Sequence, residues 1–330
     1  MCPESPEATS STLRLACASY WPSTGSPLGH LLGLRQRLLR AVTACGVRVA
    51  VLHRAQWLLH WVEGAPGAVD MAWQRIQRMP ELEASRLLHR SFGPQTLNQP
   101  LHIAAVFRKE WPEQVGRRIA QLAHFPPPGA EPACIWNALA APAQVPPCGS
   151  MVIASAREHD DVDLLRRLAQ RHDGEVVYRR FAGADPAQFD SGAAYADFAG
   201  PCRCSVRVHV LSRRCLRNEL VLGELANVRD LVLLLGSRAS LCQQLAQAAV
   251  ELLRTQCAGA RVHLLASEPA SVALAGGLLR DAGVDATVPT RTLRSGEEEA
   301  DYLEITLASM EGELPGACPS WDRGQPALAA

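Results

Sequence analysis

The chain has 330 residues, of which 48% are hydrophobic and 20% are charged, and its formal net charge at pH 7 is zero. These are the values of a globular protein, and the length is sufficient for two domains of ordinary size. A neutral chain gives no electrostatic reason to bind nucleic acid or an anionic membrane, so we expect neither partner.

The cysteine content argues against a secreted disulfide framework. The eleven cysteines are an odd number in a long chain, and the sequence does not open with a basic segment followed by an apolar run. No uncharged apolar run approaches the roughly 18 residues that cross a bilayer; the stretch from Leu220 to Gly236 comes closest and is interrupted by Glu224, Arg229 and Asp230. We therefore expect a cytoplasmic protein with reduced thiols.

Residues 1–11 are rich in Ser, Pro and Glu and are expected to form a disordered lead-in. Leu13, Leu15 and Cys17 then alternate with small or polar residues, which predicts a strand. Ser26 can cap a helix that starts at Pro27 and keeps a helical apolar spacing as far as Cys45. Further strands are predicted around 47–51, at 56–64, at 84–92 and at 101–107, with a helix from Pro66 to Pro80.

The stretch Gln56–Pro66 joins a buried strand to a helix start. Leu58, His60 and Val62 project to one face of this strand, and Leu59 and Trp61 project to the other. Because both faces are largely apolar, the strand lies in a sheet that is covered on both sides. His60 is then either a site residue or a satisfied core histidine.

The predicted order is strand, helix, strand, strand, helix, strand, followed by one more strand. This is the split βαβ arrangement of ferredoxin-like folds, in which two helices cover one face of an antiparallel sheet.

Three motifs add a resemblance to this pattern: the run from Trp57 to Val69 with its Val62-Glu63-Gly64-Ala65-Pro66 turn, the later Arg75-Ile76-Gln77, and Arg90-Ser91-Phe92. Over roughly residues 12–107 the chain resembles the BLUF family, the flavin-binding blue-light sensors of bacteria. The resemblance implies a βαββαβ fold, FAD as a cofactor and a role in signalling.

The chain departs from that family where the light chemistry occurs. The family's photocycle needs a Tyr on the first strand, an Asn on the first helix and a Gln on the third strand, around the flavin ring. By the resemblance these positions fall on Cys17, on Ala41 or Val42, and on His60. Without the phenol and the amide the usual light-driven switch cannot operate, so we expect that FAD has been lost.

Two interpretations of Cys17 and His60 remain open. A thiol beside an imidazole could have a lowered pKa and be redox-reactive, or both positions could have drifted to ordinary core residues after the loss of a cofactor. Glu63 is expected to interact with the start of the following helix, where a carboxylate is favourable.

Residues 108–124 are predicted to form a helix that closes the BLUF-like domain, residues 12–124. Residues 125–150 are rich in Pro and Ala and are expected to be a linker. Ile135, Trp136 and Leu139 interrupt the linker with a short helical piece that should dock on one domain.

Strands and helices alternate in the second half, and the central strands are apolar throughout. This pattern predicts a doubly wound parallel α/β domain over residues 151–312. Residues 182–203 are expected to be a loop, 213–226 a helix, and the tail from 313 disordered.

The end of a central strand, Gly236-Ser237-Arg238-Ala239-Ser240, is the natural place for a phosphate-binding turn. It lacks the glycine-rich and lysine-containing motifs, and a plain helix cap by Ser237 or Ser240 is the simpler interpretation. Cys202-x-Cys204 could bind a metal or form a disulfide, but structural thiols are the simpler interpretation there too.

The leading hypothesis is a signalling protein with a flavin-poor BLUF-like domain, acting through protein partners and able to form a homodimer. A second hypothesis is an FAD-binding photoreceptor in which His60 replaces the usual amide. A third is a nucleotide-binding protein or enzyme with its site beside Gly236. Because no nucleophile, base and orienting residue form a recognisable set in the sequence, the enzyme hypothesis ranks below the first.

Overall fold

The computed structural model describes residues 12–22, 27–79, 82–108, 110–124, 131–141, 147–157, 161–183, 191–199, 205–225, 227–289 and 292–312. The chain divides into two compact units: the first is Met1–Pro142 with Val177–Ala193 and Asn218–Glu224, and the second comprises Ala143–Val176, Ala194–Arg217 and Leu225–Ala330. Within the described ranges, no helix has the length and apolar character needed to cross a membrane.

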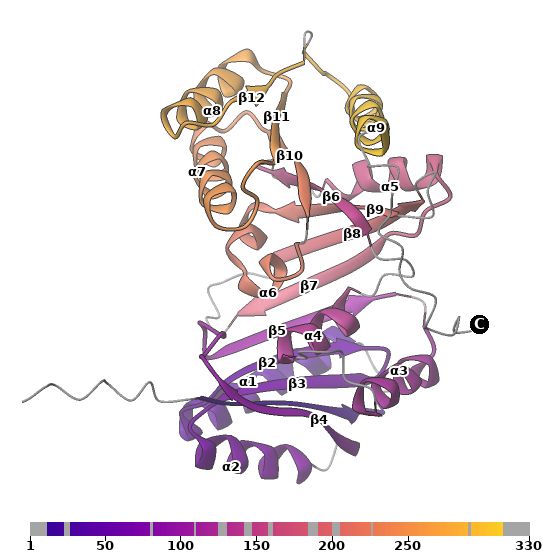
Figure 1. The fold of residues 1–330 in the computed structure, drawn as a ribbon, viewed down its shortest axis with the longest axis vertical. Helices are drawn as coiled ribbons and strands as arrows, with labels where there is room; N and C mark the ends of the chain where they lie inside the picture. The colour runs from indigo at the N-terminus through magenta and orange to yellow at the C-terminus, as the bar shows by residue number, and fades with distance from the viewer. Residues whose placement is uncertain are drawn as a thin grey trace, which may run out of the picture. The chain divides into compact units, whose positions relative to one another are not determined.

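The first unit is built on a sheet with strand order β7-β5-β2-β3-β1-β4 (Figure 1). Its elements in chain order are β1 (Thr12–Tyr20), α1 (Pro27–Cys45), β2 (Arg48–Arg54), β3 (Trp57–Gly64), α2 (Pro66–Gln77), β4 (Glu83–Gly93), β5 (Leu101–Phe107), α3 (Pro112–His124), α4 (Pro132–Ala140), β7 (Val177–Gly183) and the single turn α6 (Glu219–Leu222).

The strand pairing gives the predicted βαββαβ topology. β3 lies between β1 and β2 and is antiparallel to both, while β4 pairs antiparallel with the other edge of β1. A two-residue turn at Ala55 and Gln56, both with positive φ, connects β2 to β3. Turns of this kind match the twist of a hairpin and fix its register.

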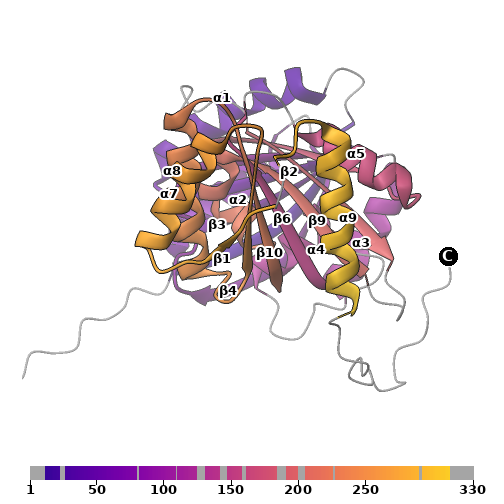
Figure 2. The same cartoon turned by 90° about the horizontal axis from the view of Figure 1, so that it is seen from above.

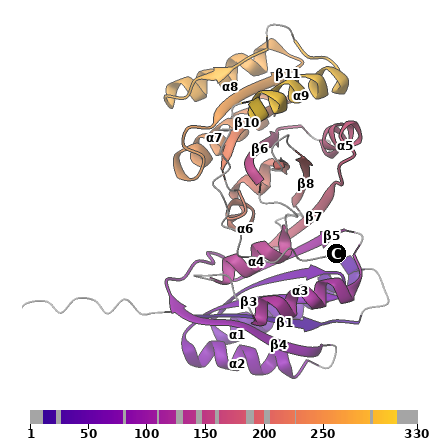
Figure 3. The same cartoon turned by 45° about the vertical axis from the view of Figure 1, so that its right-hand side comes forward.

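Helices cover both faces of this first sheet. α1 and α2 pack on one face, and α3 and α4 pack on the other (Figure 3). On the second face the rings of Trp61 (β3) and Trp136 (α4) have centroids 6.3 Å apart. α4 lies in the stretch expected to be a linker, and its Ile135, Trp136 and Leu139 are buried, in agreement with the expected docking of this piece.

The second unit contains a sheet with strand order β12-β11-β10-β6-β9-β8. Its elements are β6 (Pro147–Ser155), α5 (Val162–Arg171), most of β8 (Ser191–Ala199), β9 (Ser205–Ser212), a 3₁₀ turn η1 (Arg213–Arg217), β10 (Val228–Leu235), α7 (Ala239–Thr255), β11 (Arg261–Ala266), α8 (Pro269–Asp281), β12 (Ala286–Thr287) and α9 (Gly296–Gly312).

Five strands of this sheet, from β12 to β9, run parallel. α7 and α8 lie on one face, whereas α5 and α9 lie on the other (Figure 2). Helices on both faces of a parallel sheet define a doubly wound α/β fold. The predicted fold class is therefore confirmed.

Two predictions for the second half were wrong. Residues 182–203 are not a loop throughout, because β8 lies inside them; its alanines and glycine have low strand propensity, but burial of Tyr195 and Phe198 stabilises the strand. Residues 213–226 do not form one helix. Asn218 separates η1 from α6, since its side-chain oxygen accepts a hydrogen bond from the Leu220 N–H and caps the second segment.

Candidate functional site

The register of the first sheet places Cys17 on β1 directly opposite His60 on β3. His60 in turn lies opposite Val51 on β2. Directly opposed residues of an antiparallel pair project to the same face of the sheet. Both Cys17 and His60 are completely buried. The structure thus brings together two of the positions that the family resemblance identified.

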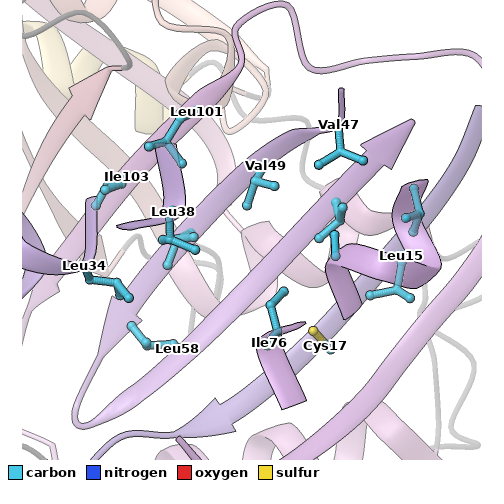
Figure 4. Close-up of a cluster of buried hydrophobic side chains, with 14 of the residues drawn as sticks. Leu15, Cys17, Leu34, Leu38, Val47, Val49, Leu58, Ile76, Leu101 and Ile103 are labelled. Atoms are coloured by element: carbon cyan, nitrogen blue, oxygen red, sulfur yellow. The ribbon is translucent and has the colours of Figure 1, made fainter. Parts of the chain in front are cut away.

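The first two helices close over this face. Leu34 and Leu38 of α1 and Val69 and Ile76 of α2 belong to the same buried cluster as Cys17 (Figure 4). The cluster continues along the strands through Leu15, Val49, Val51, Leu58, Val62 and Ile103. The face on which the resemblance would place a flavin ring is therefore packed with the chain's own aliphatic side chains.

Ala41 and Val42, the remaining two predicted positions, lie within α1. Their side chains are outside the described residues. The prediction for them therefore stays a prediction.

His60 places a polar ring in this largely aliphatic core. Among the residues that the structure describes, neither of its ring nitrogens has a hydrogen-bond partner. Burial lowers the pKa of His60 to about 4, so the imidazole is neutral at pH 7. A neutral imidazole still has one donor and one acceptor. Leaving each of them unsatisfied costs about 1–3 kcal/mol.

Cys17 does not have the properties of a reactive thiolate. Burial raises the pKa of its thiol well above the ordinary value. A redox-active cysteine needs a lowered pKa and access to solvent. The neutral His60 opposite it supplies no positive charge. The surroundings of the pair therefore favour a structural thiol.

A second buried histidine lies on the same face. His53 on β2 is opposite Leu58, and its ring meets the ring of Trp21 edge-on at 5.7 Å. Its Nδ1 has no hydrogen-bond partner in the described ranges, and burial lowers the pKa of His53 to about 4. The described part of the core under α1 and α2 thus contains two neutral imidazoles, His53 and His60.

Glu63 does not bind the start of α2 as predicted. Its carboxylate accepts hydrogen bonds from the backbone N–H groups of Thr96 and Leu97 at 2.8 and 2.9 Å and from the Trp61 indole at 3.0 Å. Glu63 and Trp61 share the face of β3 opposite His60, so the carboxylate points away from α2. It holds the segment before β5 against the sheet.

The second unit has a cavity of about 520 Å³ at the carboxyl ends of β6, β10 and β11. Arg157 follows β6, and its guanidinium donates to the carboxylate of Glu299 on α9 and to Asp161. The cavity is further lined by Gly236, Ser237 and Arg238 after β10, by Ser267 and Glu268 after β11, and by Leu293 to Gly296 before α9.

The turn after β10 is where the sequence predicted it, but its cap is not. The N-cap of α7 is Arg238, without a side-chain cap, and not Ser237 or Ser240. The carbonyl oxygen of Gly236 accepts hydrogen bonds from Ser271 Oγ at 2.8 Å and from Cys242 Sγ at 3.2 Å. These contacts fix the turn at Gly236, and Ser237 beside it is exposed and lines the cavity.

A buried polar network at the other end of this sheet was not predicted. Asp230 accepts two hydrogen bonds from Arg261 and one from His263 Nε2, and His263 Nδ1 meets the hydroxyl of Tyr302 at 2.9 Å. Despite burial, these hydrogen bonds hold the pKa of Asp230 below its usual value. The Arg-x-His pattern at the start of β11 was visible in the sequence, but its Asp partner lies on another strand.

None of the described residues forms a group of three or more His, Cys, Asp or Glu side chains arranged to hold a metal ion. Cys202-x-Cys204 lies outside the described residues, so the predictions about it stay predictions.

No protein-family model matches the chain. No curated protein matches it either. Among solved structures, "BlrP1 BLUF" aligns at 15% identity and a TM-score of 0.29, over 40% of this chain and 90% of that one. Klebsiella pneumoniae BlrP1 with FMN and cyclic diGMP aligns at 13% identity and a TM-score of 0.30, over 91% of this chain and 74% of that one. A bacterial light-regulated adenylyl cyclase aligns at 12% and 0.27, over 34% of this chain and only 33% of the cyclase. These scores are too low to support an assignment of fold or function.

Proposed function

We propose that the chain is a bacterial signalling protein whose first unit is a BLUF-like domain without a working flavin photocycle, and that it acts through protein contacts. One observation carries this proposal. Cys17 and His60, where the resemblance would require Tyr and Gln, face each other inside a closed aliphatic core.

The residues present do not fit the flavin chemistry of the family. Position 17 carries a thiol in place of the phenol that donates an electron and a proton in the family's photocycle. Position 60 carries an imidazole in place of the glutamine amide, so the amide whose hydrogen bonds rearrange in the family's photocycle is missing. The side chains of α1 and α2 pack directly on this face. The first unit therefore retains the fold as a packed scaffold that presents a surface to protein partners.

A surface for protein contact is available at the edge strand β4. β4 is the last strand in the order of the first sheet, and it exposes Leu87 and Phe92. An exposed edge strand with apolar side chains is a common site of strand addition or dimer formation. A second copy of the chain is the occupant that we propose for it.

The visible absorbance spectrum of the purified full chain tests the flavin-free function. We expect no flavin band, either as purified or after incubation with FAD and removal of the excess. Flavin bound in near-stoichiometric amounts, and released on denaturation, would contradict the proposal.

One observation supports the second candidate, an atypical FAD-binding photoreceptor. The two nitrogens of His60, which have no partner among the described side chains, could form hydrogen bonds with a bound heterocycle. The same spectrum, recorded before and after blue illumination, tests it: a bound flavin whose band shifts reversibly with light is required.

A further inference from the structure

The cavity of the second unit lies where the connections of a doubly wound sheet diverge. β6 and β10 are parallel neighbours. The chain leaves β6 toward α5, which packs with α9 on one face, and leaves β10 toward α7, which packs with α8 on the other (Figure 2). Open α/β sheets bind ligands in the crevice outside the carboxyl ends of two such strands. The cavity of about 520 Å³ occupies this crevice, and its size is that of a small-molecule site.

The lining of this cavity mixes apolar side chains with polar ones and carries both charges. Arg238 and Arg294 are exposed at its wall, and Glu268 stands at the end of β11. The hydroxyls of Ser237, Ser267 and Ser295 are also at its wall. Arginine is the side chain that best matches a phosphate, because its planar fork can donate two parallel hydrogen bonds.

The Arg157–Glu299 ion pair forms part of the cavity wall. The Glu299 side chain is 7% exposed and the Arg157 side chain 25% exposed. A largely buried pair holds its geometry better than a surface pair. It therefore gives the cavity a fixed wall between the end of β6 and the start of α9.

A second cavity, of about 250 Å³, adjoins the first through Leu293, which lines both. Its lining is apolar and comes from β11, α8 and the segment before α9: Leu264, Ala266, Pro269, Val272, Val288 and Pro289. The two cavities thus form a charged compartment and an apolar compartment. The connection from β11 to α8 contributes to both, since Glu268 lines the first and Pro269 lines the second.

We propose that the second unit binds a nucleoside phosphate across these two cavities. The phosphate lies in the charged compartment against Arg238 and Arg294. The carboxylate of Glu268 accepts hydrogen bonds from the ribose hydroxyls, as an acidic residue at the end of the neighbouring strand does in dinucleotide-binding sheets. The base enters the apolar compartment beside Leu293.

Titration calorimetry of the full chain in a phosphate-free buffer tests this site. The probes are ADP, GDP and UDP, together with adenosine and inorganic phosphate alone. We expect saturable binding of at least one nucleotide with a Kd below about 1 mM, and binding at least about tenfold weaker for adenosine and for phosphate. Adenosine has no phosphate for the two arginines, and inorganic phosphate leaves the apolar compartment empty.

Three variants distinguish the contributions of the two compartments to binding. Arg238→Gln with Arg294→Gln should weaken nucleotide and phosphate binding about tenfold or more and leave adenosine binding unchanged, since a charge-assisted hydrogen bond is lost. Glu268→Gln should weaken nucleotide and adenosine binding and leave phosphate binding unchanged. Arg254→Gln, at the other end of α7 and away from both cavities, is the matched control and should bind like the wild type.

The proposal is wrong if no nucleotide binds, or if phosphate binds as tightly as the nucleotides. Equal weakening by Arg254→Gln would also contradict it, because the effect would then reflect overall charge.

Discussion

Cys17 lies directly opposite His60 across β1 and β3, and neither side chain reaches solvent. The thiol is held neutral by burial, and both imidazole nitrogens lack a hydrogen-bond partner within the described part of the chain. Core histidines normally have such partners. The unsatisfied nitrogens of His60 therefore mark a position whose residue type is not optimal for packing alone.

Replacing His60 with Leu should stabilise the protein. The change removes two unsatisfied polar atoms from an apolar core and keeps most of the volume, so we expect the free energy of unfolding to rise by about 1–2 kcal/mol. His263→Leu is the control, because its two ring nitrogens are hydrogen-bonded, and it should cost about 1–3 kcal/mol. Urea unfolding of both variants measures the difference. A destabilised His60→Leu protein would indicate that His60 has a partner in solution.

Stability should fall as the pH is lowered from about 6.5 to about 4. The pKa values of His60 and His53 are lowered by burial from 6.5 to about 4. In this window the unfolded chain takes up protons that the folded chain does not, so each histidine favours unfolding by about 1.4 kcal/mol per pH unit. Above pH 6.5 both states leave the imidazoles neutral, so this destabilisation is absent, and it reaches its full size below about pH 4.

The measurement is the free energy of unfolding at several pH values. His60→Leu should reduce its pH slope by one proton, and the double variant with His53→Leu by two. An unchanged slope in the double variant would show that the two imidazoles are not neutral in the native core.

Periodicity and turn chemistry were sufficient to predict most of the fold. The helix from Pro27 to Cys45 and the strand from Leu101 to Phe107 have the predicted bounds. The residues that begin and end these two elements can be recognised in the local sequence. α9 was missed, although Ser295 and Glu298 have the spacing of a capping box and the Ser295 hydroxyl accepts from the Glu298 N–H.

The candidate sites were predictable only in part. The resemblance pointed to Cys17 and His60, but their mutual contact depends on strand register. The partner of Glu63 lies 33 residues away, and the grouping of Arg157 with Glu299 joins residues 142 apart. Such contacts depend on the tertiary fold, so they cannot be predicted from a local sequence pattern.

Glu224→Gln should destabilise the first unit. Glu224 forms an ion pair with Arg179 of β7, and both side chains are 1% exposed. Removing one charge of a buried pair leaves the other without its carboxylate, which costs about 3–5 kcal/mol. Arg217→Gln breaks an exposed pair with Glu251 and should cost less than about 1 kcal/mol. Thermal or urea unfolding distinguishes them, and similar small losses would mean that the buried pair is not maintained in solution.

Phe92→Glu should weaken self-association without changing stability. Phe92 is 59% exposed on the edge strand β4, so its replacement should alter the free energy of unfolding by no more than about 0.5 kcal/mol. A charge in an apolar contact between copies should raise the dimer Kd about tenfold or more. Sedimentation equilibrium measures it, with Ile305→Glu, an exposed apolar residue of α9 in the second unit, as the control. If the two variants associate equally, β4 is not the dimer contact.

The thiols should differ sharply in reactivity. Cys134 is exposed, whereas Cys17, Cys215 and Cys242 are buried, and burial raises the pKa of Cys17. A thiol reagent reacts with the accessible thiolate. Brief alkylation of the native chain followed by peptide mass mapping should therefore modify Cys134 and leave Cys17 unmodified until a denaturant is added. His60→Leu should leave Cys17 protected, since the neutral imidazole does not activate it. Rapid native labelling of Cys17 that is lost in His60→Leu would instead identify a reactive thiol and imidazole pair, and the first unit would then have a redox function.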